Sequence, residues 1–384
     1  MSDARAGGDF VHAEARNLDP PGRFDRDAVC VLGLPFDMVD LAQAVEKIRA
    51  AAFTNTRCFV STPNLNFLIA AQRDPGFRDS VLRSDLSLAD GAPIVWIARC
   101  LGLPLAERVA GASVFEALRA HAGPPLTVFF FGGPPGVAEA ACRNLNKVPG
   151  GLRCVGFDDA GFGSTDEMSA SERIAKINST GAQFVVVALG AKKGQAWIER
   201  NAAALEAPVL CHLGAVVNFV AGTVKRAPLW MQHGGLEWLW RIKEERGLWR
   251  RYFGDGVAAF RLVLGRVLPY AFLLRRRKGM RQPPGLHVSR VGDDAIEIRL
   301  GGAWVRATRG PLRDALSQGA ASGVCVSLTL REVTEVDGAF VALLMLARGR
   351  MGPARLRIWQ APPVARSIFW YNAAEFLLEP AHIE

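Results

Sequence analysis

The sequence of 384 residues lacks the motifs that would assign it at once to several classes of protein. It has no Cys-x-x-Cys pair and no His-Glu-x-x-His motif, and its 6 histidines are scattered, which argues against a built-in transition-metal site. It also has no low-complexity tract and no N-terminal apolar run typical of a signal peptide. Its 7 cysteines stand singly within apolar patterns, so we expect reduced, buried thiols in a cytosolic protein.

The formal net charge of +9 is confined to one segment. Residues 241–281 contain 12 Lys and Arg against 3 acidic residues, which accounts for the whole excess. Aromatic residues, among them Trp249 and Phe253, lie between these basic residues. This composition indicates a phosphate-rich partner, which could be an anionic membrane, a diphosphate substrate or nucleic acid. We rank nucleic acid last, because no recognition fold accompanies the charge.

The first two thirds of the chain alternate apolar strand patterns with amphipathic helix patterns. The run Leu126–Phe131 is wholly apolar, and similar strands are expected at 57–61, 183–189 and 208–212. Continuous apolar strands that alternate with helices are typical of a mainly parallel sheet covered on both faces. We therefore expect an α/β domain with a Rossmann-like sheet.

Four parts of the chain differ in composition. Residues 1–27, rich in glycine, proline and acidic groups, are expected to be a disordered tail. The α/β domain would occupy residues 28–228 and open with a strand over 28–34. A basic helical appendage would cover 229–281, and a small mixed α/β domain would cover 286–384.

The appendage contains a run, 257–274, that is nearly apolar enough to span a membrane. Two arginines and a proline interrupt it, and each central arginine would cost about 2.5–3.5 kcal/mol on insertion. We therefore expect a helix that lies in the membrane interface. An ordinary helix packed on the protein's own core is the alternative. The expected apolar face consists of Phe260, Val263, Leu264, Val267, Ala271 and Leu274.

Asp90 is the first candidate for a catalytic group. It precedes Gly91 at the mouth of an apolar element, near the polar turn Thr62-Pro63-Asn64 that ends a strand. A carboxylate in such a turn can be aimed at a cleft, although local sequence by itself favours a structural turn or helix cap. Glycines also follow expected strands at Gly132, Gly133 and Gly190, where backbone amides could reach a nucleotide.

These motifs, in this order, resemble the WecG/TagA/CpsF family of glycosyltransferases over about residues 29–252. The resemblance rests on several short runs: Thr62-Pro63-Asn64, Ala89-Asp90-Gly91, Glu107-Arg108-Val109-Ala110-Gly111, Phe131-Gly132-Gly133, Leu189-Gly190-Ala191, and Lys225-Arg226-Ala227-Pro228 followed by Gly235-Leu236-Glu237-Trp238-Leu239-Trp240-Arg241.

The resemblance implies transfer of a sugar, typically an N-acetylhexosamine or its uronate, from a UDP-sugar to a polyprenyl-diphosphate-linked saccharide at the cytoplasmic membrane face. It implies an inverting, metal-independent reaction with Asp90 as general base and with Thr62 and Asn64 beside it. No cofactor is expected. A departing UDP needs its charge neutralised, which arginines can do. The expected substrate-binding residues are Arg108, Gly132, Gly133, Gly190, Lys193, Arg226, Arg241, Arg250 and Arg251.

Two departures from the family pattern support an alternative. The family usually reads Gly-x-Pro-Lys-Gln-Glu where this chain has Gly190-Ala191-Lys192-Lys193-Gly194-Gln195, and Asn218 stands where an Asp is usual. A catalytically silent adaptor, which binds nucleotide-sugar or membrane and recruits partners through its tail, would tolerate such changes.

The last domain resembles a STAS domain through Val333-Thr334-Glu335-Val336-Asp337-Gly338-Ala339-Phe340 and the apolar helix that follows. Many such domains carry a phosphorylatable Ser after the Asp, but here that position is Gly338. We therefore expect a constitutive docking or self-association module that uses apolar surface around Phe340 and the helix 364–371. The alternative is that these aromatics fill the domain's own core.

Overall fold

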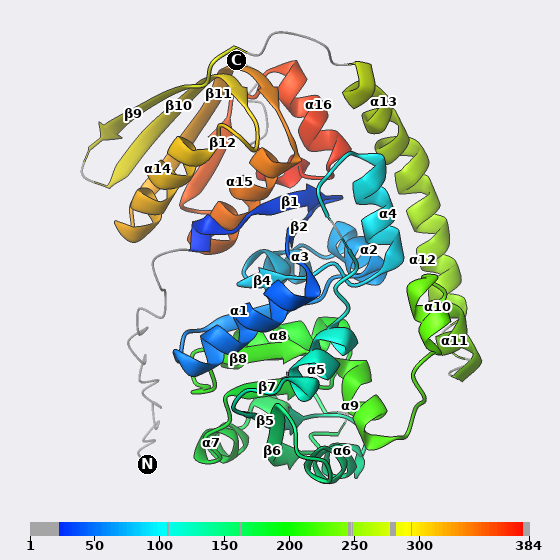
Figure 1. The fold of residues 1–384 in the computed structure, drawn as a ribbon. Coiled ribbons are helices and arrows are strands. Elements are labelled where there is room, and N and C mark those ends of the chain that lie inside the picture. Colours follow the sequence, from blue (N-terminus) through cyan, green and yellow to red (C-terminus); the bar gives the residue numbers. More distant parts are fainter. Residues whose placement is uncertain are drawn as a thin grey trace, which may run out of the picture.

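The computed structural model describes residues 23–105, 107–161, 163–244, 247, 249–276, 282–292 and 294–378. Its largest element is a six-stranded sheet with the order β4-β3-β8-β7-β5-β6, in which all pairs are parallel (Figure 1). The strands are β3 (Cys58–Ser61), β4 (Leu86–Ser87), β5 (Leu126–Phe131), β6 (Leu152–Asp158), β7 (Phe184–Val187) and β8 (Val209–His212). The predicted Rossmann-like parallel sheet is thus confirmed.

Helices cover both faces of this sheet, because its central strands are apolar on both sides. In β5, Phe130 packs with helices on one face, while Phe129 and Phe131 pack with those on the other. The ring of Phe131 stacks on Trp197 at a centroid distance of 4.1 Å. The first face carries α1 (Leu41–Phe53), α5 (Gly111–Ala120), α6 (Val137–Asn146) and α9 (Gly214–Ala221), and the second carries α7 (Ser171–Ser179) and α8 (Ala191–Asn201).

The segment 28–34, expected as one strand of the sheet, is instead part of a separate hairpin. Strands β1 (Ala28–Val31) and β2 (Leu34–Asp37) pair antiparallel, and Leu32 and Gly33 make the turn with positive φ angles of 46° and 88°. A two-residue turn of this kind matches the twist of the strands it joins. A Cβ at Gly33 would lie 2.8 Å from the carbonyl oxygen of Ala373, so this turn sits directly against the C-terminal domain.

The C-terminal domain has a four-stranded sheet of its own, with the order β12-β11-β10-β9. Its first two strands form a hairpin, in which β9 (Gly285–Val291) runs antiparallel to β10 (Ala295–Trp304). The pairs of β10 with β11 (Cys325–Val336) and of β11 with β12 (Leu356–Trp359) are parallel. The helices of the domain are α14 (Gly310–Ala321), α15 (Gly338–Met351) and α16 (Pro363–Tyr371).

One hydrophobic core joins the C-terminal domain to the rest of the chain. It includes β1, β2, the helices α2 (Leu65–Arg73), α3 (Pro75–Leu82) and α4 (Ala92–Cys100), and the buried helix α15. Phe340 and Phe369 are fully buried in it, with their rings edge to face at 6.5 Å. The prediction of an exposed apolar surface at Phe340 is therefore wrong, because the hairpin and α3 already cover α15. Of the helix 364–371 that the same prediction included, Trp370 is 44% exposed.

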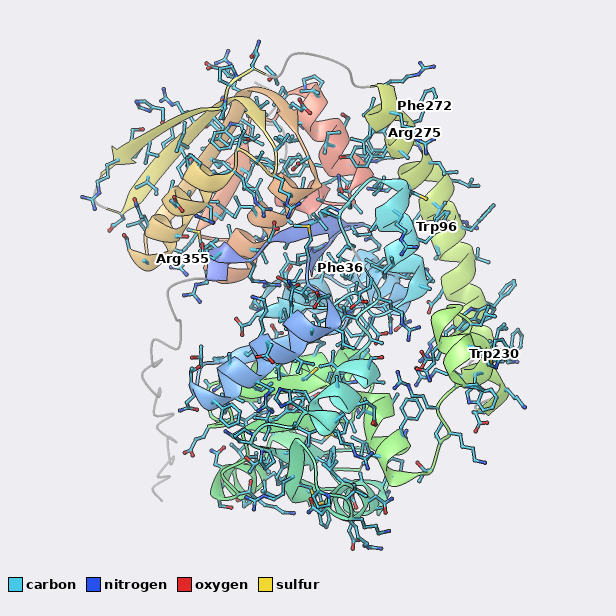
Figure 2. The ribbon with its side chains drawn as sticks, viewed as in Figure 1. Phe36, Trp96, Trp230, Phe272, Arg275 and Arg355 are labelled. Atoms are coloured by element: carbon cyan, nitrogen blue, oxygen red, sulfur yellow. A yellow bond between two sulfur atoms is a disulfide. The ribbon has the colours of Figure 1, made fainter. Side chains whose placement is uncertain are left out.

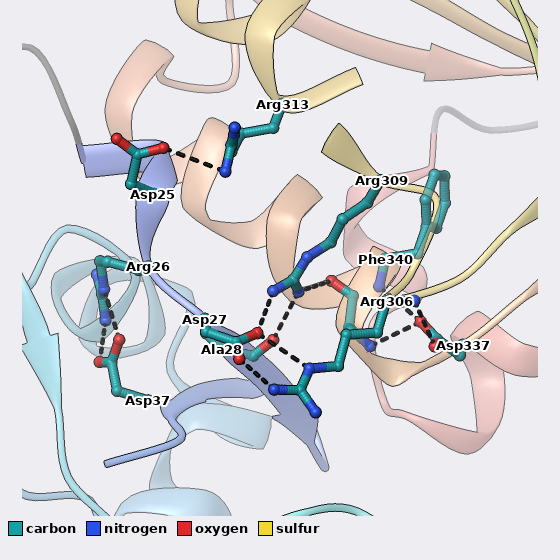
Figure 3. A network of polar contacts seen from close by, with 11 residues as sticks. Asp25, Arg26, Asp27, Ala28, Asp37, Arg306, Arg309, Arg313, Asp337 and Phe340 are labelled. Atoms are coloured by element: carbon teal, nitrogen blue, oxygen red, sulfur yellow. Dashed lines mark hydrogen bonds and ion pairs between the residues drawn. The ribbon is translucent and has the colours of Figure 1, made fainter. Parts of the chain in front are cut away.

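A polar network holds the same interface together (Figure 3). The carboxylate of Asp27 accepts hydrogen bonds from the guanidinium groups of Arg306 and Arg309. Asp25 pairs with Arg313 at 3.2 Å. Residues 23–27, expected as the end of a disordered tail, are thus ordered, while residues 1–22 lie outside the described residues.

The basic segment forms a helical flank along one side of the molecule, right in Figure 1. It consists of α10 (Leu229–His233), α11 (Glu237–Glu244), α12 (Trp249–Leu262), the π-helical segment η4 (Val263–Val267) and α13 (Leu268–Arg276). Residues 249–276 make one 28-residue helix, with a mean hydropathy of 1.7 over its most apolar window. By length and composition this helix could cross a membrane.

The expected apolar face of this helix is divided in the structure, since Val263, Val267, Ala271 and Leu274 pack against the protein while Phe260 and Leu264 are exposed. Val267, Tyr270 and Ala271 are buried, and Tyr270 stacks on Tyr371 at 5.4 Å. Phe260, expected on the same face, is 63% exposed. The sequence could not separate the two faces, because apolar residues occupy both. The outer apolar residues form one row, the apolar stripe, which consists of Trp249, Phe253, Val257, Phe260, Leu264, Leu268 and Phe272.

The expectation of single, buried thiols is wrong for three cysteines. Cys142 on α6 and Cys154 on β6 form a disulfide, and Cys325 is exposed. The helix and the neighbouring strand bring Cys142 and Cys154 together although they are 12 residues apart in sequence. A search for close pairs such as Cys-x-x-Cys could not find them.

Candidate functional site

The candidate site is built where the neighbouring strands β3 and β4 end. The backbone N–H of Leu88 donates to Ser61 at 2.9 Å, and the N–H of Asp90 donates to the carbonyl of Pro63 at 3.0 Å. These bonds extend the sheet pairing beyond the strands and hold the turn 62–64 against the turn at Asp90. The carboxyl ends of parallel strands, where such sheets bind ligands, therefore carry the two predicted motifs side by side.

The Asp90 side chain is partly buried at the ends of these strands. Its Oδ2 accepts a hydrogen bond from the backbone N–H of Gly111 at 3.4 Å. Among the described residues, this is the only hydrogen bond to the carboxylate. Burial raises the pKa of Asp90 to about 6, although the charge of Arg108 and the Gly111 hydrogen bond act against the rise. Glu237 raises this pKa further and Arg241 lowers it. A carboxylate with such a pKa is a stronger base than a solvated aspartate.

Gly91 lets the chain turn at this point. Its φ of 149° lies in the region that residues with a Cβ rarely adopt, and a Cβ here would lie 3.7 Å from that of Asn64. Asn64 itself caps α2, since its Oδ1 accepts from the N–H of Phe67 at 3.3 Å. The buried Thr62 lies beside Gly111, where an added Cβ would be 3.2 Å from the threonine methyl. Thr62, Asn64 and Asp90 thus share one small region, as predicted.

The helical flank contacts this region through Arg108, and a second arginine, Arg226, lies just before the flank. Arg108 forms an ion pair with Glu237 of α11 at 2.8 Å. Arg226 donates to the Ser113 hydroxyl at 2.9 Å. The Nε atoms of Arg226 and Arg241 are buried, and neither has a hydrogen-bond partner among the described residues. Buried guanidinium N–H groups without a partner favour the binding of an anion.

The remaining arginine candidates, Arg250 and Arg251, lie elsewhere. Both are exposed on α12, and each guanidinium lies over an aromatic ring of its own helix, 5.6 Å from Trp249 and 5.3 Å from Tyr252. The charges of Arg108 and Arg241 lower the pKa of Asp90, whereas Arg250 and Arg251 have no such effect on it. Of the predicted arginines, Arg108 and Arg241 act on the charge of Asp90, and Arg226 is held at Ser113, two residues after the Gly111 that donates to Asp90.

The predicted glycines follow β5 and β7 at the same edge of the sheet. Gly132 and Gly133 have φ angles of 93° and 94°, and Gly190 precedes α8 without a side-chain cap. The backbone N–H groups in the first turn of α8, an eleven-residue helix, can donate hydrogen bonds to a phosphate, as can those of the turn at Gly132 and Gly133. Lys193 donates to the carbonyl of Gly163 at 3.0 Å, so it supports the loop after β6.

Sequence reasoning missed three residues under this site: Gly194, Gln195 and His212. A Cβ at Gly194 would lie 2.3 Å from Cδ2 of His212, so glycine is required where the histidine packs on α8. Burial lowers the pKa of His212. Gln195 is buried and donates to the Ser61 hydroxyl at 2.8 Å, directly below Thr62. The signal for Gly194 and Gln195 was the departure from the family pattern at 190–195, and nothing in the sequence marked His212.

Asn218, the second departure, lies on α9, where its carbonyl accepts from the backbone and side chain of Thr223. Nothing in these contacts explains the replacement of an acid there.

Comparison with known proteins agrees with the geometry. A model of the glycosyl transferase WecG/TagA/CpsF family matches residues 29–271. A protein of Bacillus spizizenii, N-acetylglucosaminyldiphosphoundecaprenol N-acetyl-beta-D-mannosaminyltransferase, is 27% identical over 198 residues, which cover 51% of this chain and 75% of the relative. The matched family region runs through the α/β domain and into the helical flank.

Proposed function

Because this chain belongs to the WecG/TagA/CpsF family of UDP-sugar glycosyltransferases, we propose that it transfers an N-acetylhexosamine or a related sugar to a polyprenyl-diphosphate-linked saccharide. The relative's name supports this class of acceptor, since it acts on a diphosphoundecaprenol-linked sugar. Asp90 carries the proposal, because a base with a raised pKa stands at the strand ends where the sheet receives ligands. The pathway would be the synthesis of a surface or exopolysaccharide.

The proposed reaction is a single displacement with inversion. The Asp90 carboxylate takes the proton of the acceptor hydroxyl as its oxygen attacks the anomeric carbon. The bond from that carbon to the UDP oxygen breaks, and UDP leaves with the electron pair. At pH 7 an acid with a pKa of about 6 is mostly ionised, so the base is ready before the acceptor binds.

The charge that develops on UDP needs cations, and we assign this task to Arg226 and Arg241. Their buried Nε–H groups have no partner in the described residues and can donate to a diphosphate. The amides at Gly132, Gly133 and Gly190 are available for the nucleotide. In this scheme the transfer needs no metal ion, so turnover should persist in a chelator.

We further propose that the enzyme lies on the inner face of the plasma membrane through its helical flank. The apolar stripe is exposed, with Phe253 at 68%, and exposed basic residues such as Arg275 flank it. Figure 2 shows Trp230 and Phe272 toward opposite ends of this flank. Apolar side chains beside basic ones are typical of interfacial helices. A spanning arrangement would strip Val267, Tyr270 and Ala271 from their contacts with the protein.

For the C-terminal domain we propose a STAS-like fold that acts as a permanent part of the enzyme. Asp337 caps α15 by accepting from the N–H groups of Ala339 and Phe340. A Cβ at Gly338 would lie 3.4 Å from the carbonyl oxygen of Cys30. The position at which many STAS domains carry a phosphorylatable Ser therefore faces the hairpin here. This packing supports a constitutive role.

The decisive experiment incubates the purified full chain with vesicles that contain a polyprenyl-diphosphate-linked saccharide and with a panel of UDP-sugars, and follows UDP release. UDP-N-acetylhexosamines should release UDP only when the acceptor is present, and the Asp90→Asn protein should not. Bound UDP-sugar without turnover for any acceptor would favour the catalytically silent adaptor.

A further inference from the structure

A groove beside the helical flank is separate from the residues assigned to catalysis. It lies between the C-terminal half of α2 and the helix 249–276, and Trp370 of α16 also lines it. Its volume is about 320 Å³. Ile69, Leu262 and Trp370 contribute apolar surface, and Arg73, Arg261 and Arg266 contribute cationic groups. The groove therefore combines apolar side chains that can contact a hydrocarbon chain with guanidinium groups that can bind an anion.

The three arginines differ in their partners. Arg266 forms an ion pair with Glu375 at 2.8 Å, and its guanidinium lies 4.7 Å from the centre of the Trp370 ring. Arg73 and Arg261 are exposed, and neither forms an ion pair with another described residue. Two uncompensated cations at the mouth of an apolar groove attract an anionic group that carries an apolar chain.

The groove lies between the site around Asp90 and the apolar stripe that we assign to the membrane. Helix α2 starts after Asn64, beside Gly91, and Arg73 lies nine residues further on, which is about 13 Å at 1.5 Å per residue. On α12, Arg261 lies next to Phe260 of the apolar stripe. The groove thus begins a short distance from Asp90 and opens beside the surface assigned to the membrane.

We propose that this groove binds the diphosphate and the first isoprene units of the lipid-linked acceptor. Arg73 and Arg261 contact the phosphates, and the chain follows Ile69 and Leu262 toward the apolar stripe. The acceptor sugar then extends along α2 to Asp90. This assignment rests on the proposed function for the identity of the lipid.

Gly265 offers a test that removes no charge. It lines the groove, and a Cβ added to it would meet no atom within 4 Å. Gly265→Leu should therefore fill the groove without a backbone clash. Gly256 on the same helix is equally open but is not among the groove residues, so Gly256→Leu is its matched control.

The experiment measures binding of the full chain to phosphatidylcholine vesicles doped with undecaprenyl diphosphate or, at equal charge, with phosphatidylglycerol. Arg73→Ala/Arg261→Ala and Gly265→Leu should each weaken binding to the undecaprenyl diphosphate vesicles about tenfold more than binding to the phosphatidylglycerol vesicles. Arg275→Ala/Arg276→Ala, which removes the same charge from the end of the helix, should weaken both to the same extent.

Equal losses on both vesicles for the groove variants would overturn the proposal, as would a wild-type protein without preference for undecaprenyl diphosphate. Competition by soluble pyrophosphate at an affinity equal to that of undecaprenyl diphosphate would also overturn it, because the hydrocarbon chain would then contribute nothing. The readout needs no turnover, so a failure of glycosyl transfer leaves this result interpretable. If the wild type transfers sugar and the groove variants still bind the undecaprenyl diphosphate vesicles normally, the role of the groove is rejected and the proposed function is kept.

Discussion

Asp37 accepts a hydrogen bond from the backbone N–H of Ser87 at 2.6 Å, so the N-terminal hairpin is bonded to the strand that leads to Asp90. The same carboxylate forms a buried ion pair with Arg26, which also donates to the carbonyl of Ser84. The hairpin in turn packs on α15 of the C-terminal domain. The edge of the catalytic sheet and the C-terminal domain are therefore held by one shared element.

Asp37→Ala should destabilise the fold and lower activity. It leaves the Arg26 guanidinium buried without its partner, which typically costs about 3–5 kcal/mol. Denaturant unfolding would measure the loss. Asp25→Ala is the control, since the Asp25 side chain is 69% exposed and its pair with Arg313 should contribute under about 1 kcal/mol. Similar losses for both variants would contradict the buried pair, and Arg26→Leu/Asp37→Leu should be less harmful than Asp37→Ala.

Asp90→Asn should abolish transfer, with a fall of about 10²–10⁴-fold in rate. The wild-type rate should itself fall as the pH drops below about 6, because the base is then protonated. UDP binding should remain nearly intact. A variant that turns over at the wild-type rate would show that Asp90 is only a turn residue.

The same substitution should change the pH dependence of stability. The folded pKa of about 6 lies above the usual aspartate pKa of 3.8, so wild-type stability declines as the pH rises from about 4 to 6. At most about 3 kcal/mol is involved. Asp90→Asn removes this penalty, so its stability relative to the wild type should rise across that window. Thermal unfolding at pH 4 and pH 8 tests this, and a constant difference would count against a raised pKa.

Gly194→Ala should destabilise the protein through overpacking against His212, by about 1–3 kcal/mol. Gly194→Ala/His212→Ala should recover part of this loss, because the clash is then absent. The control is Gly256→Ala, whose Cβ would meet nothing and which should gain about 0.5–1 kcal/mol. If the double variant is no more stable than Gly194→Ala, the contact with His212 is not the cause.

Arg241→Ala and Arg251→Ala should separate donor use from membrane binding. The buried Nε of Arg241 is available to a diphosphate, so its loss should raise the KM for the UDP-sugar about tenfold or more. Arg251 is exposed, so its loss should chiefly weaken binding to anionic vesicles, by a few-fold. Steady-state kinetics and vesicle flotation of both proteins check this, and an equal KM change in both would show that both arginines meet the donor.

Local pattern was sufficient for the central strands of the α/β domain, although not for the hairpin 28–37. Apolar runs such as Leu126–Phe131 predicted the parallel strands, because strands buried on both faces must be apolar throughout. The motifs at Thr62, Asn64 and Asp90 predicted one site, because the carboxyl ends of parallel strands share an edge. These inferences need only nearest neighbours in sequence and the geometry of a sheet.

Tertiary packing decided what the sequence left open. Whether Phe340 faced a partner or a core depended on the hairpin 28–37, which lies some 300 residues away in sequence and has no local signature for that contact. The exposure of Phe260 depended on which of two apolar helix faces met the protein. The partnerless Nε of Arg241 and the need for glycine at position 194 arise from contacts between distant segments, which residue type and spacing do not encode.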